Sequence, residues 1–214
     1  MNKMKVGVLG SGDVGRVLAS GFIGLGHDVK IGTREPAKLA EWASAAGAHA
    51  SVGSFEEAAS FGDLIVLATL GTGTTSAVRL AGTQNFDGKV VIDATNPLDF
   101  SSGLPRLSIG FEDSLGEQVQ RMVPDARVVK AFNTVGNALM INPQLPGGPP
   151  DMFIAGDDED AKKIVGQICT HFGWGVVDLG GIEASRYLEP MCLVWVLHGI
   201  RAKSWGHAFK LLGK

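Results

Sequence analysis

A short apolar run that breaks into glycines and then turns helical constrains this chain more than any other feature. Residues 5–9 form the apolar run, and Gly10-Ser11-Gly12-Asp13-Val14-Gly15 follows with the spacing G-x-G-x-x-G. Gly10 permits a tight turn, Gly12 lets a pyrophosphate approach the backbone, and Gly15 lets the helix pack on the strand. Free N–H groups and the helix dipole favour phosphate oxygens at this point. The pattern therefore predicts a dinucleotide site at the first βα junction, although a plain turn is the alternative.

Short apolar segments alternate with helical spacing along most of the chain. The predicted strands are 5–9, 29–31, 64–69, 90–94, 128–132, 152–155 and 175–178, and the predicted helices between the early ones are 14–25, 37–46 and 76–81. Such alternation is typical of right-handed βαβ crossovers and a parallel sheet covered on both faces. We expect an α/β fold of the Rossmann type, with a doubly wound, mostly parallel sheet and a C-terminal helical extension.

The segment "INPQLPGGPP", residues 141–150, is dense in proline and glycine and is interpreted as a loop within one unit. Residues 1–214 are therefore expected to form a single dinucleotide-binding domain, with 1–142 as its core and 151–214 completing it. Acidic residues 157–160 start a helix, and from residue 182 the sequence predicts one long helix or two. The face formed by Leu188, Met191, Val194 and Trp195 could belong to the core or to a dimer interface. His198 and His207 are expected in the same helical region, in packing roles.

The second predicted strand ends in Thr33-Arg34, where a carboxylate would be expected in a protein that binds NAD. The Thr33 hydroxyl can donate a hydrogen bond, the Arg34 guanidinium can bind a 2′-phosphate with two donors, and Lys38 can add a positive charge. These residues favour NADP over NAD. The alternative is a solvated Arg34 that pairs with Glu35.

Three later strands end in polar residues and turn formers, and the carboxyl ends of parallel strands border the ligand in folds of this type. The segment after 64–69 could bound the adenosine side or the nicotinamide ribose. The turn after 90–94 and the segment after 128–132 could meet the nicotinamide, or could be ordinary turns. The residues predicted at these ends are Thr69, Leu70, Asn96, Pro97, Asn133 and Thr134.

Composition narrows the class of partner. The formal net charge is -3 with no basic tract, which gives no reason to expect nucleic acid. The apolar stretch 191–200 is too short to cross a bilayer, so no membrane association is expected. With Cys169 and Cys192 as the two cysteines, neither a disulfide framework nor a metal site is predicted, and a reducing, cytoplasmic location fits.

No residue pattern for acid–base or nucleophilic catalysis stands out, so no catalytic residue is assigned. Hydride exchange between two redox rings needs the rings held in contact with water excluded, and little proton transfer by the protein. A dinucleotide site without a catalytic triad is suited to that reaction.

Several segments together resemble the F420-dependent NADP oxidoreductases. They are the glycine turn, "GTREP", "VVKAFNTV", "GDDEDAKKIVGQI" and "DLGGIEASRYLEP", and the resemblance runs over essentially the whole chain. The chain is also similar to the cytoplasmic part of the membrane-bound STEAP ferric reductases. The resemblance implies hydride transfer between NADP(H) and a second redox cofactor, either the deazaflavin coenzyme F420 or a flavin, FMN or FAD.

Residue roles follow from the resemblance position by position. It implies that Ser11, Gly12, Asp13 and Val14 surround the pyrophosphate, that Thr33, Arg34 and Lys38 bind the 2′-phosphate, and that Leu70 and Asn137 line the nicotinamide side. It also implies a homodimer. Archaeal enzymes of the family have a histidine and a proline where this chain has Asn133 and Gly136, so the second ring stays open between a deazaflavin and a flavin. Two alternatives remain: an NADPH-dependent reductase of a small organic substrate such as a cyclic imine, and a non-enzymatic NADP(H) sensor.

Overall fold

The apolar runs of the sequence become the strands of a six-stranded parallel sheet in the computed structural model, which describes residues 2–213. Met1 and Lys214, which belong to the expected domain, lie outside the described residues. The strand order is β3-β2-β1-β4-β5-β8. This is the order of a doubly wound dinucleotide-binding sheet, so the predicted fold class is confirmed. The strands are β1 (Lys5–Leu9), β2 (Asp28–Gly32), β3 (Ala50–Gly53), β4 (Leu64–Leu67), β5 (Val90–Asp93) and β8 (Arg127–Lys130).

Helices cover both faces of the sheet, and the strand side chains alternate between two cores. Ile65 and Leu67 of β4 pack with α3 (Phe55–Phe61), α4 (Gly71–Ala81) and α5 (Leu115–Met122), whereas Leu64 and Val66 pack with α1 (Asp13–Gly24) and α6 (Glu159–His171). The central strands are buried on both sides, which explains why they read as continuous apolar runs. The short η1 (Pro36–Leu39) and α2 (Ala40–Ala46) lead from β2 to β3.

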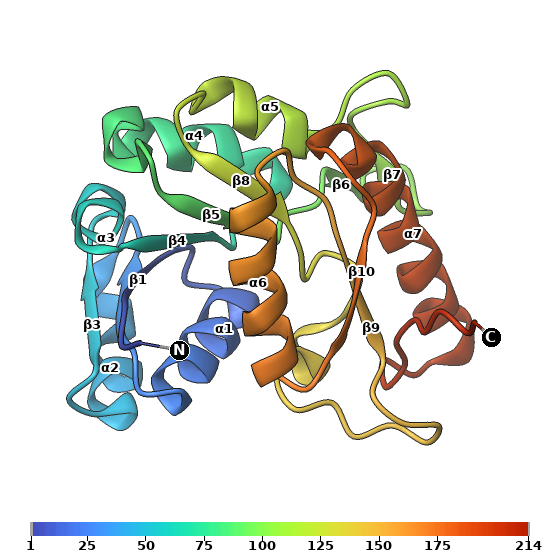
Figure 1. Ribbon diagram of the computed structural model, residues 1–214, viewed down its shortest axis with the longest axis horizontal. Helices are drawn as coiled ribbons and strands as arrows, with labels where there is room; N and C mark the ends of the chain where they lie inside the picture. The colour runs from blue at the N-terminus through green and yellow to red at the C-terminus, as the bar shows by residue number, and fades with distance from the viewer. Residues whose placement is uncertain (1, 214) are drawn as a thin grey trace.

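Two small sheets extend the main one. β9 (Asp151–Ile154) pairs in parallel with β10 (Gly175–Asp178), and an antiparallel bridge between Lys130 and Ala155 connects β8 to this pair. The other small sheet is the antiparallel pair β6 (Leu98–Asp99) and β7 (Arg106–Leu107). β3 and α7 (Ser185–Ala202) lie at opposite ends of the molecule, and α7 runs beside β9 and β10 (Figure 1).

The chain after α7 returns along that helix without being helical. Trp195 Nε1 donates to the carbonyl oxygen of His207 at 2.8 Å, and the His207 ring stacks on Trp195 with centroids 4.8 Å apart. Asp151 N then donates to Phe209 O at 2.9 Å. The expectation that His207 is helical is therefore wrong, because α7 ends at Ala202 with Lys203 in the left-handed conformation (φ 50°).

The four residues of the apolar face predicted on the last helix differ in how far they are buried. Leu188 and Trp195 are buried, Met191 is half-buried, and Val194 is 58% exposed. Cys169 and Cys192 are both buried and free. Among residues 2–213, no helix combines the length and the apolar character that a membrane crossing requires.

Several elements were not predicted, and one predicted helix begins at another residue. β3, α3, α5 and the β6–β7 pair are additional, and η2 (Thr83–Phe86), η3 (Asn137–Leu139) and η4 (Ile182–Ala184) are short turns of 3-10 helix. The helix predicted over 76–81 begins earlier, at Gly71. A side chain at Gly71 would overlap the carbonyl group of Asn96, so this glycine permits close packing at the start of α4.

Candidate active site

The carboxyl ends of the central strands open into a cavity of about 860 Å3. Residues that follow β1, β2, β4 and β5 line it, together with the start of α4. This is the edge at which ligands bind in doubly wound sheets. The predicted site residues that line the cavity are Gly10, Ser11, Gly12, Asp13, Val14, Thr33, Arg34, Lys38, Thr69, Leu70 and Asn137.

The glycine turn forms one wall of the cavity. Gly10 has φ 129°, a conformation that side chains disfavour, and its N–H donates to Gly32 O at 3.0 Å. A side chain at Gly15 would overlap Gly10 O, so Gly15 serves the packing of α1 on the turn rather than the cavity surface. Within the described residues, Gly12 has no heavy atom within 4 Å of the position of an added Cβ, and no side chain caps the N-terminus of α1. The N–H groups of the first helical turn are thus open to an anionic ligand.

The end of β2 and the adjacent glycine turn present two hydroxyl groups and, among the described residues, a guanidinium without an ion-pair partner. Ser11 Oγ and Thr33 Oγ1 hydrogen-bond at 3.1 Å, and Glu35 N donates to Thr33 Oγ1 at 3.3 Å, so the buried Thr33 is held in place. Lys38 Nζ pairs with Glu35 at 2.7 Å, and this hydrogen bond lowers the pKa of Glu35. In the described part of the chain Arg34 has no ion-pair partner, contrary to the alternative in which it pairs with Glu35. These groups are suited to a phosphate on the ribose 2′ position.

The lining of the cavity is slightly basic. Its basic residues are Arg16, Arg34 and Lys38, and its acidic residues are Asp13 and Glu35. Because Asp13 pairs with Arg16 at 2.6 Å and Glu35 pairs with Lys38, the guanidinium of Arg34 is the unbalanced charge. The donors and charges present therefore fit a phosphorylated dinucleotide.

The other predicted residues support the cavity from behind its surface. Asn96 Nδ2 donates to Asn133 O at 2.8 Å, and Asn133 Nδ2 donates to Asn96 Oδ1 at 3.0 Å and to Leu188 O of α7 at 2.9 Å. The carbonyl oxygen of Pro97 accepts hydrogen bonds from Ser108, and Thr134 is buried. These amides connect the ends of β5 and β8 to each other and to α7, and they are not among the residues that line the cavity.

A strained residue precedes Asn133. Phe132 has φ 63° and is 1% exposed, and its N–H donates to Met152 Sδ at 3.1 Å. A bulky residue in this conformation persists only where its surroundings hold it. The ring of Phe132 packs against Phe172 of the segment after α6, so the core fixes the turn that aims Asn133 at Asn96.

Sequence reasoning missed a buried ionic network at the same strand ends. Lys130 Nζ lies 2.9 Å from Asp93 Oδ2 and 2.8 Å from Glu189 Oε1, and all three side chains are buried. Burial alone would lower the pKa of Lys130, but Asp93 and Glu189 hold it above its ordinary value. We call these three residues the charge triad. The lysine at the end of the apolar run "VVK" was a signal that a buried partner is needed.

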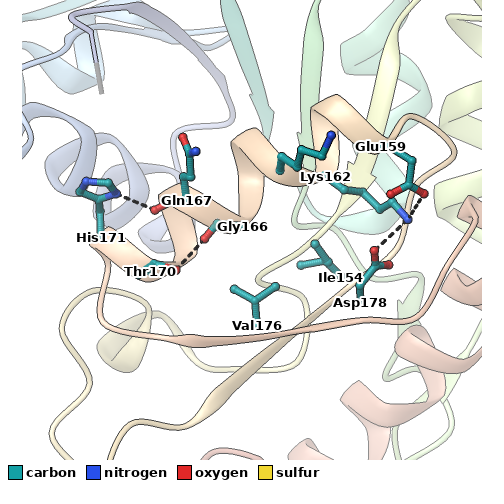
Figure 2. Close-up of a pocket in the computed structure, with 10 residues that line it drawn as sticks. Ile154, Glu159, Lys162, Gly166, Gln167, Thr170, His171, Val176 and Asp178 are labelled. Carbon is teal, nitrogen blue, oxygen red and sulfur yellow. Dashed lines mark hydrogen bonds and ion pairs between the residues drawn. The ribbon is translucent and has the colours of Figure 1, made fainter.

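A second hollow, of about 390 Å3, lies between α6 and β10 (Figure 2). Lys162 fills its polar end and pairs with Glu159 at 2.8 Å and with Asp178 at 2.9 Å. Ile154 lies beside Asp178, Val176 lines the middle of the hollow, and Thr170 and His171 lie at the other end (Figure 2). None of the predicted site residues borders this hollow, and its two lysines, Lys162 and Lys163, are already paired with carboxylates, so it is a poor candidate for a phosphate site.

Comparisons with known proteins place the chain among nicotinamide-dependent reductases. Residues 5–97 match the family described as "NADP oxidoreductase coenzyme F420-dependent". A crystal structure from Arthrobacter sp. FB24, described as a candidate F420-dependent NADP reductase, shares 39% identity and a TM-score of 0.94, covering 98% of this chain and 100% of that chain. The F420-dependent NADP reductase of Methanocaldococcus jannaschii is 29% identical over 97% of this chain and 98% of its own length.

The similarity also extends to part of a larger mammalian protein. The metalloreductase STEAP3 of Rattus norvegicus is 31% identical over 88% of this chain. The matched region is 36% of that protein, so the chain spans about a third of its length. Both groups of relatives agree with the resemblance seen in the sequence motifs.

Proposed function

We propose, on the premise that this chain belongs to the family of coenzyme F420-dependent NADP oxidoreductases, that it transfers hydride between NADPH and a deazaflavin. The observation that carries the proposal is the end of β2. There the Thr33 hydroxyl and the Arg34 guanidinium, which has no ion-pair partner among residues 2–213, occupy the place of a ribose-binding carboxylate. A 2′-phosphate would be bound there by a charge-assisted, two-donor contact. The unphosphorylated nucleotide has no negative group at this position for Arg34 to bind.

The remaining cavity residues would hold the nucleotide across the sheet edge. The open N-terminus of α1, with Ser11, Gly12, Asp13 and Val14, would bind the pyrophosphate, and the ends of β4 and β5 would border the nicotinamide. When bound, the nicotinamide supplies a hydride, two electrons with one proton, and the acceptor ring takes up that hydride together with one proton from water. The residues named here orient the two rings, and none of them is assigned a proton transfer.

The identity of the acceptor is the part of the proposal that an assay can decide. The full-length protein is mixed with NADPH and, in separate reactions, with coenzyme F420, FMN, FAD or a cyclic imine, and the absorbance of each redox partner is followed. We expect NADPH to be oxidised with F420. Oxidation with the imine alone would replace the proposal with the organic-substrate alternative, and tight NADPH binding without any acceptor consumed would favour a sensor.

We further propose that the protein works as a cytoplasmic homodimer.

The nucleotide preference is tested separately by binding. We expect Arg34→Ala to weaken NADPH binding by about 10- to 100-fold, the usual cost of a lost charged hydrogen bond, and to leave NADH binding nearly unchanged. Lys38→Ala is the matched control, because Lys38 is already paired with Glu35, and its effect should be smaller. Both dissociation constants are measured by titration calorimetry. Equal affinity of the wild-type protein for NADH and NADPH would contradict the proposed cofactor.

A further inference from the structure

The charge triad contains more negative than positive charge. Lys130 contributes one ammonium group, while Asp93 and Glu189 contribute two carboxylates, so the formal sum is -1. Their hydrogen bonds are those of ionised carboxylates: Asp93 Oδ1 accepts from Thr95 N at 2.9 Å and from Thr95 Oγ1 at 2.6 Å. The side chains of Lys130 and Asp93 are 0% exposed and that of Glu189 is 2% exposed. Water therefore does not screen this charge.

The neighbours of the triad offset the negative charge only in part. Glu189 accepts hydrogen bonds from Leu115 N and Gly116 N, both at 3.0 Å, at the N-terminus of α5. These amides contribute partial positive charge, equivalent to a fraction of an elementary charge. Cys192 stays a neutral thiol, because burial raises its pKa to about 12. Glu117 of α5 is paired with Arg186 of α7, so this pair adds no net charge.

The charge triad lies next to the cavity wall. Asp93 and Lys130 are the last residues of β5 and β8, and Ala94, the next residue after Asp93, lines the cavity. A dinucleotide that has its 2′-phosphate at Arg34, beyond β2, and crosses the end of β1 would reach this half of the sheet with its nicotinamide. The triad thus lies directly behind the wall of the nicotinamide half of the cavity.

We propose that the charge triad makes this cavity favour the oxidised nucleotide, NADP+, over NADPH. The proposal rests on the proposed function, because it assumes an NADP(H) site. The two redox states differ by one positive charge on the nicotinamide ring, and an uncompensated buried anion stabilises the charged ring. Asp93, Lys130 and Glu189 are therefore specificity-determining residues for redox state, although none of them lines the cavity.

Equilibrium binding of the two nucleotides to the full chain tests this inference without any acceptor. Glu189→Gln brings the formal charge of the triad to zero. We expect the ratio Kd(NADP+)/Kd(NADPH) to rise by about three- to tenfold, the effect of one partly offset charge acting over roughly 10 Å at an effective dielectric constant of about 20. Because the charge is buried, the ratio should change little between low and high salt.

A second variant separates charge from shape. Glu189→Asp shortens the side chain but keeps the carboxylate and leaves Asp93 paired with Lys130, so its ratio should stay near the wild-type value. Glu183→Gln, an exposed carboxylate on η4, is the surface control and should leave the ratio unchanged. If Glu189→Gln does not fold, Asp93→Asn removes the same charge from the other end of the triad.

The outcomes are distinct. An unchanged ratio in Glu189→Gln, or a Glu189→Asp variant that behaves like Glu189→Gln, would overturn the inference while leaving the proposed function intact. A wild-type protein that binds neither nucleotide would overturn the proposed function, and the inference with it.

Discussion

Gly12 and Gly15 are three residues apart in the same turn, but an added methyl group would meet different surroundings at each. At Gly15 it would overlap the carbonyl oxygen of Gly10, so Gly15→Ala is expected to destabilise the fold by about 1–3 kcal/mol or more through overpacking. The melting temperature measured by circular dichroism should fall by several degrees. A variant as stable as the wild-type protein would show that the turn can move away from the helix.

At Gly12 the added methyl group would meet open space in front of the α1 N-terminus. Gly12→Ala should therefore change the stability by less than about 1 kcal/mol, because the φ of -72° is ordinary for alanine. It should weaken NADPH binding by about tenfold or more, since the methyl group occupies the path of the pyrophosphate. Melting curves and NADPH fluorescence titrations of the two variants form one matched experiment, and unchanged NADPH affinity in Gly12→Ala would argue against a phosphate at this turn.

Among the helices, α5 and α7 are joined by an ion pair whose strength depends on pH. Arg186 Nε donates to Glu117 Oε2 at 2.8 Å, and Ser114 Oγ donates to the same oxygen at 2.8 Å. The hydrogen bond from Arg186 holds the pKa of Glu117 below its ordinary value. The stabilisation is therefore complete above a carboxyl pKa of about 4.3 and is lost as the pH falls through the lower pKa of the folded protein.

We accordingly expect Glu117→Gln to lower the free energy of unfolding by about 1 kcal/mol at pH 7, a modest value because Arg186 is partly exposed. The difference between variant and wild type should shrink at about pH 3.5, which lies below the carboxyl pKa of about 4.3 in the unfolded chain, because unfolding then takes up a proton at Glu117. Urea unfolding at the two pH values measures both quantities. A difference that stays constant with pH would indicate that the packing of the side chain, and not its charge, is responsible.

The elements that the sequence predicted well are those with a long or strongly apolar pattern. β1, β4 and β5 are continuous buried runs, and α1 follows directly from the glycine turn. α3 has seven residues, too few for a clear helical period, although Ser54 and Glu57 form the capping box that marks its start. β3 has a single β-branched residue, Val52, and is defined by its pairing with β2.

In the candidate site, too, residues in local motifs were predicted, whereas contacts between distant residues were not. Residues of the glycine turn and of the end of β2 lie within 30 positions of each other, and local motifs were enough to predict them as the lining of one cavity. The charge triad joins residues separated by 37 and 59 positions, so no local pattern reveals it. The same holds for the mutual hydrogen bonds of Asn96 and Asn133, which depend on the strand order.

At the scale of the whole molecule, an apolar stripe on α7 bears on the proposed homodimer. Tyr187, Val194 and Leu197 are 73%, 58% and 41% exposed and recur at helical spacing along one side. Exposed apolar side chains that gather on one face are common at interfaces between subunits. We expect the wild-type protein to have the mass of a dimer in light scattering and Val194→Asp/Leu197→Asp to have that of a monomer. Leu211→Asp, at an exposed leucine outside the stripe, is the control and should remain dimeric.

Lys130 and Glu189 lie far apart in the sequence, and this separation affects the order in which the parts of the chain can fold during translation. β8 is made well before α7, and until α7 docks, the ammonium group of Lys130 and the carboxylate of Asp93 remain hydrated at an open sheet edge. Only when α7 has left the ribosome can these charges be enclosed. A nascent polypeptide interrupted before Ser185 would therefore carry the complete glycine turn on a sheet whose β8 edge is still exposed to water, which is the state that a protease or chaperone would encounter.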